Sequence, residues 1–199
     1  ETNLKNEILS FYLKDNVNIS NFSDIRFGSS NSFSFTINKK FKFSNIKVDS
    51  KINLIKLIYK TNDLEIKKYL PKYNGIVELN NNDVKVSFDN KKLTIHSKGK
   101  FTTDKITDEL DLKITLKDEN YHIKSKIKLN NNPIAVKFLN YIKEENKSSL
   151  LNIELLIKKN KNILVKNFVF KESENIFLVN DLNLDNNFKI NHVNNLEFD

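Results

Sequence analysis

The stretch LDLKITLKDENYHIKSKIKL, residues 110–129, decides the fold class of this chain. In its first arm, apolar side chains at every second position alternate with polar ones such as Lys113. The polar break KDEN follows at 117–120, and a second arm repeats the pattern around Lys124 and Lys126. Successive side chains of a strand point to opposite faces, so each arm has one apolar and one charged face. The stretch therefore predicts a β-hairpin.

Similar alternating segments recur along the chain with short polar turns between them. They occupy residues 33–37, 41–54, 76–79, 84–88, 93–101, 151–157 and 163–170. Further strands are expected at 176–179, which is apolar on both faces, at 188–190 after a turn, and at 196–198. Strands about every ten residues with tight polar turns predict an antiparallel meander, so the chain is expected to be mainly β. The alternation changes phase near Ser44, which implies a bulge or a bend, and it changes phase again at Phe168.

Three short helices are expected beside the strands. Residues 3–14 place apolar side chains three and four apart, and residues 63–70 begin at the N-cap candidate Asp63 and stop before Pro71. Residues 133–145 begin at Pro133 and carry apolar residues on one helical face. No linker divides the chain, so residues 1–199 are interpreted as one unit, with 130–149 as the one candidate seam.

The charge of the chain is carried by lysine. It has 33 basic and 25 acidic residues, a formal net charge of +8, and Arg26 is its only arginine. Lysine lacks the bidentate fork that reads phosphates and base edges, and the aromatic residues lie on the apolar phase, away from the lysines. These features argue against nucleic acid as a partner, although the lysines also suit anionic phospholipid head groups.

No catalytic signature is present. The chain has no cysteine and three glycines, which excludes thiol chemistry and a glycine-rich phosphate loop. His96, His122 and His192 lack a second ligand at metal spacing, and the acidic groups at 108–111 and 144–145 are interpreted as solvated. The sequence thus predicts a protein that is not an enzyme and that has no cofactor or metal.

Two interpretations of the apolar faces remain open. In the first, two faces bury each other in a closed core, as in a structural or adhesion-type domain of a larger surface protein. In the second, the sheet is open and curved, and its apolar face holds lipid. No apolar run reaches the ~18 residues of a membrane span, and the chain begins with Glu1 and contains no Met. It is therefore expected to be a segment of a longer protein, with any membrane anchor upstream.

Two stretches, DLEIKKYLPKYNG (63–75) and NDVKVSFDNKKLTIHSKGKF (82–101), and the asparagine-turned hairpins that follow resemble the AsmA/TamB/YhdP-like family of bacterial envelope proteins. The resemblance covers the chain from about Phe33 onward. It implies a curved, taco-like β-groove in a long periplasmic protein tethered to the inner membrane, similar to the eukaryotic bridge-like lipid-transfer proteins. The function implied is phospholipid transport toward the outer membrane, without an enzymatic reaction.

Under this interpretation, the expected partners are phospholipid acyl chains and neighbouring segments of the same long chain. The residues expected to line the groove are Val84, Val86, Leu93, Ile95, Leu112, Ile114, Leu116, Ile123, Ile127, Leu151, Ile153 and Leu155. Their neighbours Lys113, Lys124, Lys126 and Lys128 are expected to face solvent.

Overall fold

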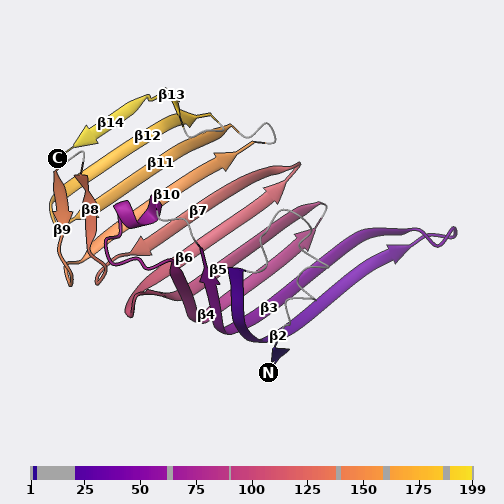
Figure 1. Ribbon diagram of the computed structural model, residues 1–199. Helices are drawn as coiled ribbons and strands as arrows, with labels where there is room; N and C mark the ends of the chain where they lie inside the picture. Colours follow the sequence, from indigo (N-terminus) through magenta and orange to yellow (C-terminus); the bar gives the residue numbers. More distant parts are fainter. Residues whose placement is uncertain are drawn as a thin grey trace.

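One large antiparallel sheet dominates the computed structural model, which describes residues 2–3, 21–61, 65–89, 91–137, 140–158, 162–185 and 189–198 (Figure 1). Within these ranges the sheet has 12 strands, which lie in sequence order except that β10 pairs with β7 and β14 pairs with β12. Its strands are β1 (Thr2–Asn3), β2 (Phe22–Ile37), β3 (Phe43–Lys60), β4 (Ile76–Asp89), β5 (Lys92–Thr103), β6 (Ile106–Lys117), β7 (Asn120–Lys128), β10 (Ser149–Ile157), β11 (Ile163–Glu172), β12 (Asn175–Leu184), β13 (Ile190–His192) and β14 (Asn195–Phe198). The predicted antiparallel meander is confirmed.

The hairpin predicted at 110–129 is formed by β6 and β7. Ile114 lies opposite Ile123, and the turn residues Asp118 and Glu119 both have positive φ, 49° and 61°. Two successive residues with positive φ match the right-handed twist of the flanking strands, which makes such turns the favoured short hairpin connections. The sequence supplies short polar residues here, where a β-branched side chain would be strained.

Both predicted changes of phase coincide with irregular pairing. The β2–β3 register shifts between Ser34 and Thr36, beside Asn45, whose φ is 51°. The β10–β11 register shifts between Glu154 and Leu155, before Phe168. Each bulge adds a residue to one strand, so the apolar side chains on both sides of it return to the same face.

The sheet is open in the part of the chain that the structure describes. Its strand order runs from β1 to β13 without returning on itself, and β13 and β14 both pair with β12. At the opposite edge, β1 pairs with β2 only at Arg26 and Phe27. An open sheet has two edges that can pair with further strands.

The helix predicted at 133–145 is wrong. The structure has two short antiparallel strands there, β8 (Ile134–Val136) and β9 (Tyr141–Lys143), joined through Asn140 at φ 51°. Ile134 is buried while Ile142 is 74% exposed, so the apolar residues do not share one helical face. Helical spacing was present in the sequence, but burial of Ile134 and Lys143 against the sheet decides the local structure.

The other two predicted helices have different outcomes. Within 63–70 the structure has a short 3-10 helix, η3 (Glu65–Lys68), and residues 62–64 lie outside the described residues. The prediction for 3–14 falls, apart from Asn3 in β1, outside the described residues as well.

The hydrophobic core sits at one end of the sheet, beneath a cover formed by residues 65–73, 134–137 and 140–143. Figure 1 shows β8, β9 and η3 over this end. Phe101 and Leu129 from the sheet are buried with Ile134 of the cover. A hydrogen bond from the Ala135 backbone N–H to the Tyr69 carbonyl, 2.9 Å, joins the two parts of the cover. The seam proposed at 130–149 contains β8 and β9, while β7 and β10 on either side of it pair directly.

Candidate functional site: the apolar face of the sheet

Apolar side chains form continuous rows across the strands on one face of the sheet. In an antiparallel pair, residues directly opposite each other project to the same side. The middle row, in strand order, consists of Val86, Ile95, Ile114, Ile123, Leu155, Val165 and Leu182. The row crosses from β4 to β12 without a charged residue, so the alternation within each strand becomes one surface, here called the apolar face.

Parallel rows extend the apolar face on both sides of the middle row, since side chains two residues apart share a face. Toward the β6–β7 turn, the rim row consists of Phe33, Val48, Phe88, Leu93, Leu116, Tyr121, Ile157, Ile163, Leu184 and Ile190. Toward the cover, the next row consists of Ile52, Val84, Ser97, Leu112, Ser125, Ile153, Phe168, Val179 and Leu196.

Every predicted lining residue lies on the apolar face, and each is half-buried. Ile127 and Leu151 differ from the others because they pack against the buried cluster under the cover. Among the described residues, the remaining predicted lining residues lie outside that cluster. The apolar face thus has a covered end and a longer part on which side chains such as Ile114 stay partly accessible.

The sequence did not reveal several residues of the apolar face. Ile52 and Phe88 extend it toward β2, and Phe168, Val179 and Leu182 extend it across β11 and β12. Alternation within each strand was a visible signal for them. The bulges at 154–155 and in β12, where Asp181 has φ 51°, hide which of their two faces continues the rows.

The opposite face is polar over most of its width. Its central row begins with Lys51, Lys85, His96, Lys113, Lys124 and Glu154. As expected, Lys113, Lys124, Lys126 and Lys128 are exposed. Cross-strand pairs organise this face: His96 Nε2 lies 2.7 Å from Asp111 Oδ1, and Lys128 Nζ donates to Glu109 Oε2 at 2.7 Å. A charged and solvated face opposite an apolar one makes the sheet strongly amphipathic.

Glu154 joins two cationic or titratable side chains on the polar face. Its oxygens lie 2.7 Å from His122 Nε2 and 3.2 Å from Lys124 Nζ. Burial raises the pKa of its carboxyl group, but the hydrogen bonds from His122 and Lys124 outweigh burial and hold the pKa below its usual value. Because the folded state favours the charged form, Glu154 contributes stability above about pH 4.5, which is lost as the pH falls through the folded pKa.

We expect Glu154→Gln to reduce the acid sensitivity of the protein. At pH 7 the variant should lose about 0.5–1 kcal/mol of unfolding free energy, the usual range for a partly exposed pair. Between pH 5 and 3 the difference from the wild type should shrink. Urea unfolding at each pH measures both effects, and a difference that stays constant with pH would contradict this role for the carboxylate.

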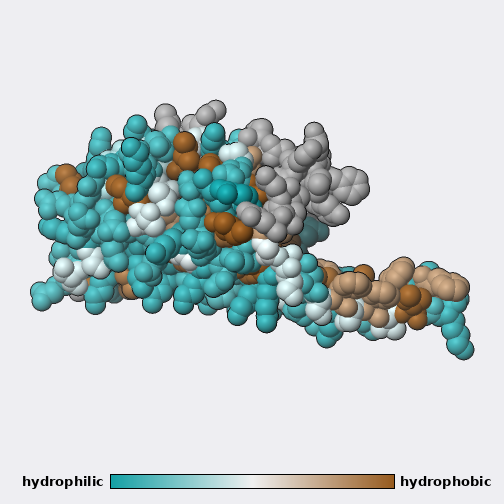
Figure 2. Space-filling view, turned by 90° about the horizontal axis from the view of Figure 1, so that it is seen from below, coloured by the Kyte–Doolittle hydropathy of each residue, from teal (hydrophilic) through white to brown (hydrophobic). Residues whose placement is uncertain are grey.

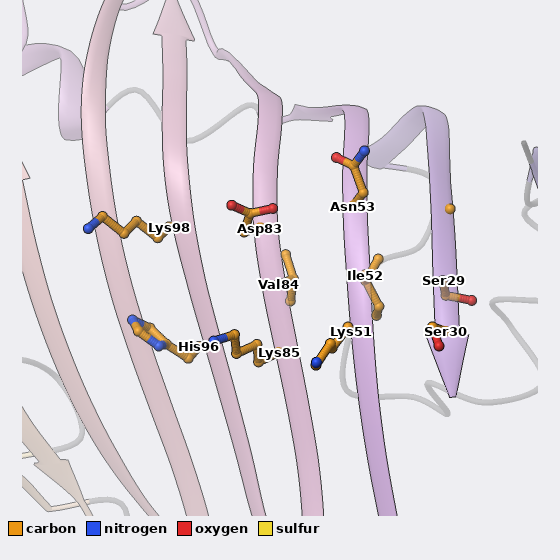
Figure 3. Close-up of a pocket in the computed structure, with 11 residues that line it drawn as sticks. Ser29, Ser30, Lys51, Ile52, Asn53, Asp83, Val84, Lys85, His96 and Lys98 are labelled. Carbon is orange, nitrogen blue, oxygen red and sulfur yellow. The ribbon is translucent and has the colours of Figure 1, made fainter. Parts of the chain in front are cut away.

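A shallow pocket of about 480 Å³ lies mainly on the polar face, across β2 to β5 (Figure 3). Its lining includes Lys51, Asp83, Lys85 and Lys98 together with His96, on adjacent strands. His96 is already held by Asp111, and Lys51 and Lys85 are exposed. The pocket therefore resembles a solvated part of the polar face more than a built binding site.

A buried polar cluster ties the cover to the sheet. Asp108, 3% exposed, accepts hydrogen bonds from the backbone N–H groups of Asn131 and Asn132 and from Asn132 Nδ2, at 2.9, 3.0 and 2.8 Å. Thr103 donates to Asn132 Oδ1 at 2.9 Å, and Lys143 Nζ donates to the Asn132 carbonyl at 2.6 Å. The interpretation of Asp108 as a solvated carboxylate is wrong, because the chain folds back over it.

This cluster is well suited to a structural role. Burial lowers the pKa of Lys143, against the raising influence of the nearby Asp108 and Glu172 carboxylates. Lys143 and Asn132 are essentially fully buried, so a substrate has no access to these groups. Their hydrogen bonds fix the position of β8 and β9 over the apolar face.

Within the described ranges, no group of three histidine, cysteine or acidic residues is arranged to hold a metal ion. The described ranges also contain no helix with the length and apolar character needed to cross a bilayer. Comparison of the chain with protein-family models, curated proteins and solved structures finds no match. The apolar face is therefore the main feature that points to a function.

Proposed function

We propose that this chain is a non-enzymatic segment of a phospholipid-transport protein and that its apolar face holds acyl chains. The observation that carries the proposal is the middle row, which is apolar without interruption from β4 to β12, on a mostly half-buried face opposite a face of lysines and carboxylates. Large apolar patches on protein surfaces mark interaction sites, which favours a ligand bound on this face.

The physical gain from such a surface is large. Moving an acyl chain of about 16 carbons through water costs on the order of 12 kcal/mol, at ~0.8 kcal/mol per CH₂. A continuous aliphatic surface removes most of that cost without any reaction. The lining is aliphatic along the middle row and offers no directional polar contact there, so a bound chain can slide from one strand to the next. Residues such as Ile95, Ile114 and Ile123 provide equivalent contacts at each step.

The setting of this segment is part of the same proposal. We place it in the periplasm, within a longer protein of the AsmA/TamB/YhdP-like type that is anchored in the inner membrane. Neighbouring segments would pair with the edges that are open among the described residues, at β1 and β2 and at β13 and β14, which would extend the apolar face and protect those edges from aggregation. The closed-core alternative requires a second apolar layer over the face, and among the described residues only the cover, over one end, supplies one.

Photo-crosslinking tests the proposal directly. A benzophenone amino acid replaces Ile114 in one variant and Lys113 in a matched control one residue away on the opposite face. Each purified protein is incubated with vesicles containing labelled phospholipid and irradiated. We expect capture of label at position 114 at least about tenfold above that at 113, because apolar contact falls to nearly nothing on the charged face.

Equal capture at both positions, or none at either, would contradict an acyl-chain site on the apolar face. A second readout combines Ile114→Asp with the benzophenone amino acid at position 123, which lies opposite residue 114. A charge beside the acyl chain should reduce the amount of label captured at position 123. Circular dichroism confirms in each case that the strand content is retained, so that loss of capture is not loss of fold.

A further inference from the structure

The β2–β3 hairpin extends beyond the rest of the sheet. Pairing between β3 and β4 ends at Lys47 and Asp89, while pairing between β2 and β3 continues to Ile37 and Phe43. Residues 34–46, here called the overhang, therefore have no further strand beside them in the described part of the chain. Figure 2 shows the overhang projecting from the body as a narrow arm with tan and brown surface.

The overhang exposes more large apolar side chains than any comparable part of the described chain. The exposed fractions are 71% for Phe33 at its base, 45% for Phe35, 48% for Ile37, 85% for Phe41, 62% for Phe43 and 46% for Ile46. The rings contact one another, with centroids 6.3 Å apart for Phe33 and Phe35 and 5.2 Å for Phe35 and Phe43. They remain open to solvent all the same, and exposed clusters of this kind mark contact sites.

The charge around these rings has one sign. Lys39, Lys40 and Lys42 surround Phe41 at the tip, and residues 33–48 contain no acidic side chain. A second copy of the overhang would bring the same positive tip against it, which disfavours self-association. Aromatic and aliphatic side chains beside lysines fit the interface of an anionic bilayer, where the rings enter the headgroup region and the lysines meet lipid phosphates.

We propose that the overhang is a membrane-contact element that inserts Phe41 and Phe43 into the surface of an anionic phospholipid bilayer. This inference goes beyond the acyl-chain site and does not depend on it, because it rests on different residues. The overhang continues the apolar face, since Phe33 and Val48 both belong to the rim row. Docking of the tip would thus place a bilayer directly next to that row.

Vesicle co-sedimentation tests the inference. The full chain is mixed with phosphatidylcholine vesicles that either lack or contain phosphatidylglycerol. The double variant Phe41→Ser/Phe43→Ser should bind both kinds of vesicle at least about tenfold more weakly, since each ring loses its apolar contact. The double variant Lys39→Glu/Lys40→Glu should lose the preference for phosphatidylglycerol, and high salt should weaken the wild type in the same direction.

Matched controls separate these effects from general changes in surface hydrophobicity or net charge. Ile142 and Ile66 are 74% and 42% exposed and lie in the cover, outside the rows of the apolar face, so Ile142→Ser/Ile66→Ser should bind like the wild type. Lys91→Glu/Lys117→Glu makes the same change of net charge at other exposed turns and should retain most of the lipid preference.

Wild-type vesicle binding by the overhang variants would overturn the inference, as would an equal loss in the control variants. A change of oligomeric state instead of vesicle binding would also overturn it, in favour of a second copy as the partner. In detergent micelles, the ratio of label captured at position 114 to label captured at position 113 reports on the acyl-chain site alone. Vesicle binding reports on the overhang, so the two proposals can fail independently.

Discussion

Replacing Asp108 with alanine should lower the free energy of unfolding by about 4 kcal/mol, the largest single effect that we expect in this protein. The carboxylate accepts from two backbone N–H groups, of Asn131 and Asn132, and from the Asn132 side chain. Alanine leaves these donors without an acceptor, and each unsatisfied buried donor costs about 1–3 kcal/mol. It also removes a negative charge close to the buried Lys143 ammonium group.

Urea unfolding measured by circular dichroism gives the free-energy change for Asp108→Ala. Hydrogen exchange localises it, because the amides of β8 and β9 should lose protection before those of β4 or β5. The matched control is Glu109→Ala, the next residue, whose side chain is 54% exposed and pairs with Lys128 on the polar face. It should change stability far less than Asp108→Ala, because exposed ion pairs contribute little, and similar losses in both variants would contradict the structural role of the buried cluster.

The second large effect is expected for Gly99→Ala, at about 3 kcal/mol of unfolding free energy. Gly99 lies against the β4 bulge between Asn80 and Asp83, where Asn82 is fully buried. A Cβ at residue 99 would overlap Asn82 Oδ1 and lie 2.7 Å from Asn82 Cα. A rotation of the Asn82 side chain cannot relieve the clash with Cα, and it would break the hydrogen bond from the Lys100 N–H to Asn82 Oδ1, 2.6 Å.

Gly28→Ala is the matched control, because Gly28 also lies within a strand and a Cβ added there meets no atom within 4 Å. It should raise stability by about 0.5 kcal/mol through the entropy of the unfolded chain. Thermal unfolding of both variants under identical conditions measures the contrast. Equal stabilities would show that the β4 bulge can relax, contrary to the close approach seen between β4 and β5.

The strands and their turns could be predicted because they are local features of the sequence. Alternation at period two marks the arms of 110–129, and the residues at 118 and 119 accept the positive φ of the turn. The phase change near Ser44 indicated a bulge or a bend, and the phase change at Phe168 also coincides with a register shift. Each of these signals lies within a few residues of the element that it specifies.

The cover and the buried cluster could not be predicted for the opposite reason. Residues 133–145 carry helical spacing, yet their conformation follows from contacts with residues far away in sequence. The carboxylate of Asp108 binds the chain at Asn131 and Asn132, 23 and 24 residues later. A lysine and an aspartate in polar surroundings look solvated in sequence, and only the folded chain shows Lys143 buried.

The candidate site could be predicted in part. The predicted lining residues were selected by alternation, and strand pairing places every one of them on a single face. The width of that face was not visible, because it depends on how bulges in β11 and β12 restore the phase of Phe168 and Leu182. Coverage of Ile127 and Leu151 was likewise hidden, since it comes from β8.

The sequential strand order has a consequence for how such a protein changes its length. Each strand of the main sheet pairs only with neighbours that are close in the chain, apart from the β8–β9 excursion. Duplication or loss of one hairpin would therefore lengthen or shorten the sheet by about 10 Å, at about 4.8 Å per strand, without disturbing the pairing elsewhere. Tandem duplication of hairpins would therefore adjust the length of such a sheet to the distance that it has to span.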